Sequence, residues 1–415
     1  MMRSNILSPT GNAEGKMPEN RVVYPALDGL RAIAFLLVFL QHYYYIPWGW
    51  TGVNIFFVLS GFLITGILFD TRSERYRARN FYLRRTLRIF PLYYGVLIIT
   101  ILVDPIFHWN WSVAWIAWPL YLGNFLRYIS PAVQTSNSPA QLAAFAWLRP
   151  RQAPQLTFFY GHFWSLCVEE QFYFFWPWVV FWVRSRRTLI WICSIVVVVV
   201  PVARVLTQLV APTWMLNAQL LDSATPFQLD ALLLGALVAL LLRGSHQKRL
   251  FEVGEVVALC CGLAAGFLFF VGIVISYPNW RYGYPYPSWR LTWGQTLFDF
   301  LAAGIILCVL QPSGFLYRLL SLKPLRWIGR ISYGAYVFHD IPHELYRRFV
   351  GAIGKQCQFV AENGDFFVIV VGLTSTLLIS WLSFRFYESA FLKLKERWTV
   401  RQPNGDGKQP DTNSR

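Results

Sequence analysis

One apolar stretch of the chain, Leu27 to Tyr45, carries two side chains that are costly to bury, Arg31 and His42. They are eleven residues apart, and at about 100° per residue both side chains share one helix face. Along the axis they are about 16 Å apart, roughly half of a hydrocarbon core of about 30 Å. Ionisable groups inside a membrane span indicate a functional site by default, so this helix is the first place to expect chemistry.

A pair of carboxylates, Glu169 and Glu170, lies in a second apolar stretch, residues 163–177. Residue counts put His42 about 20 Å above the inner end of its span and the glutamates about 10 Å below the outer face, which is one shared level. An imidazole that takes a proton from a hydroxyl, with a carboxylate to orient it, is a general-base arrangement. We therefore expect these three residues to be catalytic. The alternative, that the glutamates are structural hydrogen-bond partners, stays open.

Arginine side chains gather near the inner end of the first helix. Seven of them lie between Arg72 and Arg88, and Arg31 together with Arg84, Arg85 and Arg88 would make an anion site, because guanidinium groups fit phosphate oxygens. A second interpretation pairs Arg31 with Asp28 and assigns the loop arginines to topology and lipid headgroups. The residues alone leave both interpretations open.

A third polar group, His339, Asp340 and His343, lies on a helical segment that Pro342 should kink or break. These side chains are candidates for a second polar wall or for a proton path.

Composition places all these groups in a membrane. Of the 415 residues 55% are hydrophobic and only 14% are charged, which is typical of an all-α polytopic membrane protein. The formal charge of +16 does not predict a nucleic-acid partner, because in a membrane protein the distribution of Lys and Arg matters more than their total.

Hydropathy and charge together predict ten spans with both termini cytoplasmic. In that arrangement 26 Lys and Arg residues fall in the cytoplasmic segments and 6 in the outer loops, as the positive-inside rule requires. The apolar piece 113–126 is short of the ~20 residues that a span needs, so we expect 108–162 to be an outer-face loop with a short non-spanning segment. Residues 25–395 are then one transmembrane domain between disordered cytoplasmic tails at 1–24 and 396–415.

Several pieces of the chain resemble the acyltransferase 3 family of membrane O-acyltransferases, over about residues 24 to 395. The matching pieces follow the order LDGLRAIAFLLVFLQHY, GVNIFFVLSGFLIT, LRRTLRIFPLYY, FWSLCVEEQFYFFWP, LDALLLGALVAL, IGRISYGAYVFH and FRFYESAFLKLK. One departure is Gln228, just before LDALLLG, where many relatives carry an arginine.

The resemblance implies transfer of an acyl group, often acetyl, from cytoplasmic acyl-CoA to a hydroxyl, commonly of a sugar, with no metal. It matches Arg31 and His42 to the family's arginine–ten–histidine signature, with His42 essential. Arg85 and Arg88 match its two-arginine element beside the acyl donor, and Glu169 or Glu170 matches its acidic motif.

From residues and resemblance together we expect an enzyme of the inner (plasma) membrane. Acyl-CoA would bind at Arg31, Arg85 and Arg88, and His42 would act as base or acyl relay on a carbohydrate or glycolipid acceptor. The main alternative is a proton-coupled transporter or permease, because intramembrane His, Glu and Arg also build ion pathways. A third is a structural or partner-binding membrane protein.

Overall fold

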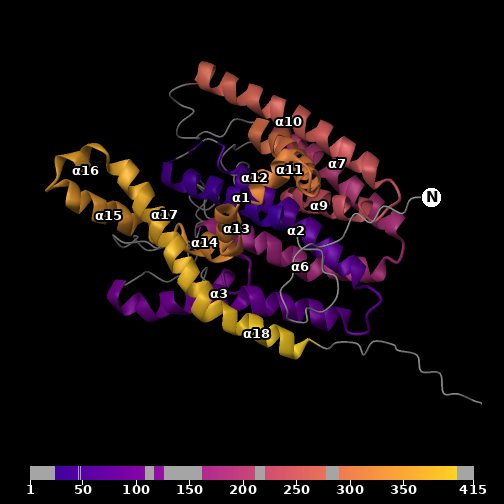
Figure 1. Cartoon of the computed structure of the whole chain (residues 1–415), viewed down its shortest axis with the longest axis horizontal. Coiled ribbons are helices and arrows are strands. Elements are labelled where there is room, and N and C mark those ends of the chain that lie inside the picture. Colours follow the sequence, from indigo (N-terminus) through magenta and orange to yellow (C-terminus); the bar gives the residue numbers. More distant parts are fainter. Residues whose placement is uncertain are drawn as a thin grey trace, which may run out of the picture.

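The structure of the protein is a computed structural model, which describes residues 24–44, 46, 48–107, 116–125, 161–210, 220–276 and 289–399. Every regular element in these ranges is helical (Figure 1). Seven helices are long and apolar enough to cross a membrane. The prediction of an all-α, polytopic membrane protein is therefore confirmed.

The centre of the molecule is formed by four helices. They are α1 (Pro25–Tyr44), α2 (Thr51–Asp70), α6 (Trp164–Trp182) and α9 (Leu229–Leu241). The helix α2 is apolar all round and buried along most of its length, which is the pattern of a helix enclosed by other helices.

Glycines bring α2 and α9 into close contact. A Cβ at Gly61 would lie 1.7 Å from the carbonyl oxygen of Leu232, and one at Gly235 would lie 2.0 Å from that of Val58. Small residues at helix crossings allow this approach in membrane proteins, where packing rather than the hydrophobic effect holds helices together.

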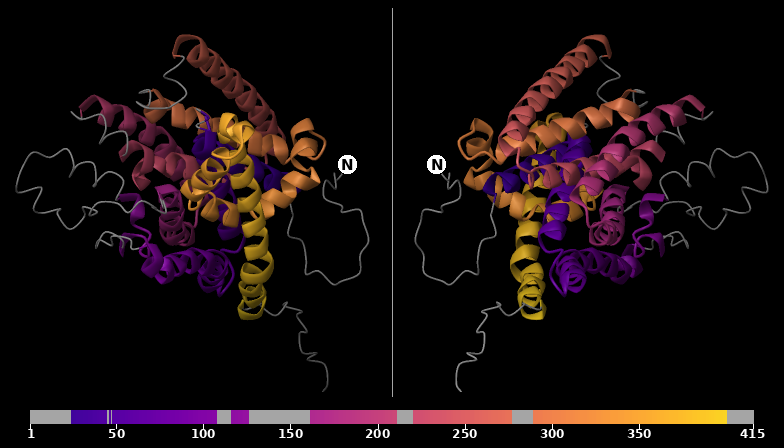
Figure 2. Two further views of the ribbon diagram at one scale, coloured as in Figure 1. Left: turned by 90° about the vertical axis from the view of Figure 1, so that its left-hand side faces the viewer. Right: turned by 90° about the vertical axis from the view of Figure 1, so that its right-hand side faces the viewer.

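Four further helices surround this centre. They are α3 (Arg77–Phe107), α7 (Arg186–Val210), α10 (Gln247–Ser276) and α11 (Gln295–Val309), the last preceded by a π-helical turn, Arg290–Gly294. Figure 2 shows α10 leaning away from the bundle, with α11 between it and the centre. Large apolar side chains on α7 and α10, such as Trp191 and Phe267, are exposed, as expected of a surface that faces lipid.

The C-terminal third closes the bundle with shorter elements. These are α12 (Phe315–Leu320), α13 (Lys323–Arg330), α14 (Ser332–Phe338), α15 (His343–Gly354), α16 (Gln358–Glu362), α17 (Gly364–Leu382), a π-helical turn (Ser383–Glu388) and α18 (Ser389–Trp398). The helices α12 and α13 pack on α1, and α18 runs beside α3 (Figure 1). The first turns of α1 therefore lie against α12 and α13, with Gly29 next to Leu320 and Gly329 next to Asp28.

One helix begins earlier than expected. Its apolar part was expected to begin at Pro91, whereas α3 is continuous from Arg77 and so includes Arg85 and Arg88 of the arginine-rich segment. The break expected at Pro342 is confirmed, since residues 331–349 form two short helices, α14 and α15, with a break at 339–342; a proline disfavours the helical conformation of the residue before it.

The count of ten spans and the cytoplasmic placement of both termini stay predictions, since α6, α9 and the α14–α15 segment are not among the seven long helices. Residues 1–23 and 400–415 of the two tails, and most of the loop 108–162, lie outside the described residues. The described part of that loop, residues 116–125, packs against α3 and α6, with Gln171 donating to the Tyr121 carbonyl at 2.7 Å.

The contact between α2 and α9 predicts a stability effect. Replacing Gly61 with alanine forces the two helices apart and should lower the free energy of unfolding by about 1–3 kcal/mol, the usual cost of overpacking. Gly266→Ala on α10 is the matched control, because a Cβ there meets nothing within 4 Å. Thermal unfolding of both variants in detergent measures the difference, and equal midpoints would contradict the prediction.

Candidate active site

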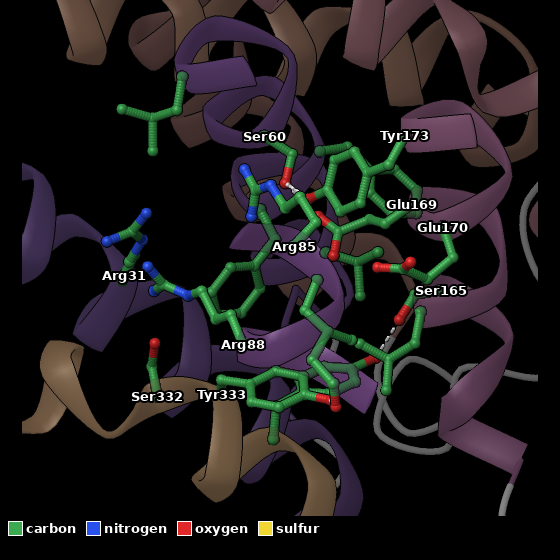
Figure 3. Close-up of a pocket in the computed structure, with 17 residues that line it drawn as sticks. Arg31, Ser60, Arg85, Arg88, Ser165, Glu169, Glu170, Tyr173, Ser332 and Tyr333 are labelled. Atoms are coloured by element: carbon green, nitrogen blue, oxygen red, sulfur yellow. Dashed lines mark hydrogen bonds between the residues drawn. The ribbon is translucent and has the colours of Figure 1, made fainter. Parts of the chain in front are cut away.

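A cavity lies between α1, α2, α3, α6 and α14. Arg31 and Arg88 lie on one side of it and the glutamates on the other, with Arg85 beside the glutamates (Figure 3). The charged residues among its lining are Arg31, Arg85, Arg88, Glu169 and Glu170. The structure thus brings together all three predicted anion-binding residues and both predicted carboxylates.

The three arginines converge from two helices. Arg85 and Arg88 are three residues apart on α3 and so share a face, and Arg31 approaches from α1 (Figure 3). Arg31 forms an ion pair with Asp28 at 3.2 Å, and the Arg85 guanidinium lies 4.6 Å from the centre of the Tyr173 ring. Among the described residues Arg85 and Arg88 have no ion pair with a carboxylate. Three guanidinium groups that line one cavity favour the binding of an anion between them.

Glu169 and Glu170 are consecutive residues of α6, and both lie on the wall of the cavity that this helix forms. Glu169 accepts a hydrogen bond from the Ser60 hydroxyl, and Ser60 lies 2.6 Å from the Tyr173 hydroxyl. Glu170 lines the same cavity and also a second one, which it shares with Arg85 and Tyr173 and which opens between α3 and α6. The carboxylates therefore balance the arginines across the cavity.

The histidine His42 lies in a separate group of polar side chains. Its Nδ1 is 2.9 Å from the Val38 carbonyl oxygen and 3.2 Å from His339 Nε2. Nδ1 of His339 is 2.7 Å from the Tyr336 carbonyl oxygen. A carbonyl oxygen only accepts, so neutral His339 carries its hydrogen on Nδ1 and offers a lone pair at Nε2. His42 then carries its hydrogen on Nδ1, which leaves the basic lone pair on Nε2.

Two further residues complete this histidine group. His162, just before α6, donates from Nε2 to the Val337 carbonyl at 3.2 Å, and its Nδ1 lies 3.5 Å from Asp340 Oδ2. Its ring centre is 4.7 Å from that of His339 and 6.5 Å from that of His42. Three imidazoles and a carboxylate thus form a contiguous group that could relay or store a proton. Among the described residues, no set of His, Cys, Asp and Glu has the arrangement of a metal site.

A single tyrosine separates the histidine group from the cavity. Tyr336 lines the cavity, and its ring centre lies 5.4 Å from that of His339. Its hydroxyl is 2.5 Å from the Ser165 hydroxyl and donates to the His162 carbonyl at 3.0 Å. The cavity thus ends directly beside the histidines.

The expectation that His42, Glu169 and Glu170 share one level is wrong. His42 contacts His162 and His339, and the glutamates follow His162 on α6 by seven and eight residues, about 10 Å along the axis. The cause is that α1 begins at Pro25, whereas the estimate assumed a span from residue 29. His42 is therefore about 26 Å from the start of its helix and not about 20 Å.

Sequence reasoning singled out His339 and Asp340 but missed His162. The available signal was its position at the start of the segment that carries Glu169 and Glu170. Gln228 donates to the Leu221 carbonyl at 2.9 Å, and a guanidinium from another helix lies next to it in the structure, on the Phe227 carbonyl. Arg204 of α7 donates to both oxygens of Asp230, at 2.6 and 2.8 Å.

Comparison with known proteins identifies the family of the chain. The family model described as an acyltransferase domain, Acyl_transf_3, matches residues 24–385. That range includes every charged residue of the cavity and all the histidines described above.

Two curated relatives show the same similarity. The peptidoglycan O-acetyltransferase OatA of Listeria monocytogenes is 26% identical over 399 residues, covering 90% of this chain and 56% of the relative. The O-acetyltransferase OatA of Staphylococcus aureus is 28% identical over 385 residues, covering 89% of this chain and 57% of the relative. The chain thus spans little more than half the length of these relatives. No solved structure matches.

The arginine side of the cavity predicts anion binding. Pyrophosphate should raise the thermal unfolding midpoint of the purified protein, since a ligand that binds only the folded state stabilises it. Arg88→Gln should weaken binding tenfold or more, because hydrogen bonds to charged groups contribute about 1.5–3 kcal/mol. Arg75→Gln is the control, because Arg75 is exposed in the loop before α3. Equal affinities of the two variants for pyrophosphate would exclude the site.

Proposed function

The chain belongs to the acyltransferase 3 family, and on that premise we propose that it is a multi-pass membrane O-acetyltransferase that acts on a carbohydrate hydroxyl. The observation that carries the proposal is the cavity itself. It has three converging guanidinium groups, and it ends at the tyrosine beside the histidine group.

The donor is acyl-CoA, with acetyl-CoA as the natural case, entering from the cytoplasmic side. Its phosphates would bind to Arg31, Arg85 and Arg88, whose planar forks suit phosphate oxygens. The spacing of about 16 Å from Arg31 to His42 along α1 leaves room for the extended pantetheine arm. The arm would pass the hydroxyls of Ser60 and Tyr173, which line the cavity.

The histidine group supplies the base. The Nε2 lone pair of His42 takes the proton from the acceptor hydroxyl while the hydroxyl oxygen attacks the thioester carbonyl. The carbon–sulfur bond then breaks, the CoA thiolate leaves, and the imidazolium returns the proton to it. The ester product and free CoA account for every atom. His339 Nε2 accepts the hydrogen of His42 Nδ1 and so orients the His42 ring, as the carboxylate of a catalytic triad orients its histidine.

The glutamates take a different role from the one expected. Since they lie beside Arg85 and not beside His42, we assign them to the donor. Glu169 accepts a hydrogen bond from Ser60 and keeps that hydroxyl in place. Together with Glu170 it also lowers the net positive charge of the cavity. CoA can therefore be released after it has bound.

The acceptor is a glycan of the cell envelope, met at the His42 end of the bundle, with the protein in the plasma membrane. Support comes from the Listeria relative, whose name states that it acts on peptidoglycan. A polymer built from N-acetylated amino sugars is therefore the first acceptor to test.

The decisive test is transfer of labelled acetyl from acetyl-CoA to a glycan by the protein in liposomes. His42→Ala should lower the rate by about 10²–10⁴-fold, the usual contribution of a general base, with CoA binding retained. His246→Ala, a change at an exposed histidine after α9, is the control. Full activity of the His42 variant would refute the mechanism. Substrate-driven proton flux without acetyl transfer would favour a transporter instead.

His339 provides a separate test of the proposed orientation. His339→Gln removes the ring that accepts from His42 Nδ1 and should lower kcat about 10–100-fold, the usual effect of losing a partner that orients a functional histidine. The KM for acetyl-CoA should stay within twofold, because His339 is not part of the cavity wall. A rise in this KM with unchanged kcat would show that His339 belongs to the donor site.

A further inference from the structure

Four tryptophans gather at the His42 end of the bundle. Trp48 and Trp50 come from the turn between α1 and α2, and Trp289 and Trp293 come from the start of the segment that leads into α11. Trp48 and Trp289 have ring centres 5.9 Å apart, and Trp289 and Trp293 have centres 5.6 Å apart. We call these four residues the tryptophan cluster.

A buried ion pair lies within this cluster. The Arg290 guanidinium lies 4.8 Å from the centre of the Trp50 ring and 3.3 Å from the Asp222 carboxylate. Arg290 is 7% exposed. The cluster therefore combines flat aromatic faces with a guanidinium and a carboxylate in one small region.

The local backbone is irregular where it presents these side chains. Arg290 and Trp293 lie in the π-helical turn that precedes α11, and such turns are frequent at functional sites. The turn is anchored to α7, because Arg204 of that helix donates to the Thr292 carbonyl and to the Thr296 hydroxyl. The positions of the aromatic rings are thus fixed by a buried polar network.

The cluster lies next to the proposed site of transfer. Gly49, between Trp48 and Trp50, packs so closely on α1 that a Cβ there would be 2.4 Å from Cβ of Gln41, the neighbour of His42. Trp50 directly precedes α2, and Val53, one helical turn further, lines the cavity. The cluster therefore lies at the same level along α1 as His42, and the helix that follows it leads to the cavity wall.

We propose that the tryptophan cluster with Arg290 and Asp222 is the acceptor subsite and binds a pyranose ring of the glycan. A pyranose presents C–H groups on its faces and hydroxyls on its edge. The first suit an aromatic face, and the second suit a guanidinium donor and a carboxylate acceptor. An aromatic belt that only anchors the protein at the membrane interface needs no buried ion pair among its rings. The inference rests on the proposed function and specifies where the glycan binds.

Two variants test the subsite by complementary routes. Trp293→Leu removes an aromatic face that is 47% exposed and so is tolerated by the fold. Asp222→Asn removes the acceptor charge with little change in volume. Each should raise the KM for a β-linked N-acetylglucosamine oligosaccharide tenfold or more and leave the KM for acetyl-CoA within twofold. Trp182→Leu is the control. Trp182 is 78% exposed and lies at the end of α6 that is away from His162 and the histidine group.

Direct binding of the same oligosaccharide, measured by calorimetry without donor, separates the two proposals. Saturable binding to the wild type that both variants weaken supports the subsite, even if no acetyl transfer is found. Acetyl transfer with an unchanged oligosaccharide KM in both variants overturns the subsite and leaves the proposed function intact. Absence of saturable binding to the wild type also overturns it.

Discussion

The arrangement of the bundle depends on the cost of keeping cations inside it. A guanidinium in hydrocarbon is expensive, and it is tolerated only where it faces water, a counter-charge or another polar group. Arg31, Arg85 and Arg88 all face one cavity, and two glutamates line it with them (Figure 3). The helices that carry these charges must therefore face one another across the cavity, where each guanidinium finds a counter-charge or a polar group.

The same constraint explains the uneven packing of the helices. On the side away from the cavity, α2 is pressed against α9 through glycines, so it forms a rigid wall that holds Ser60 in place. The outer helices α7 and α10 have mostly apolar outward faces, and Arg204 of α7 is directed inward to Asp230. The charged side chain of α7 is thus directed into the bundle and away from the apolar outer face.

Residue spacing predicted much of this site. The periodicity that placed Arg31 and His42 on one face of α1 is local, and local geometry transfers directly from sequence to structure. The grouping of Arg31 with Arg85 and Arg88 was left open by the residues alone and was favoured only by the family resemblance.

The relative depth of His42 and the glutamates could not be predicted in the same way. It depends on where each helix begins, and α1 begins at Pro25, four residues earlier than assumed. His162 and His339 come from segments far apart in the sequence, and tertiary packing brings their ring centres to 4.7 Å. No periodicity within a single segment encodes the distance between two segments that pack together.

The side chain of Tyr336 has a consequence for the cell that houses the protein. A continuous column of water across the bundle would let protons run down their electrochemical gradient and waste respiratory energy. At the end of the cavity this tyrosine is held by Ser165 and by the backbone of His162. This aromatic ring therefore lies between the cavity and the histidine group, where it would obstruct such a column.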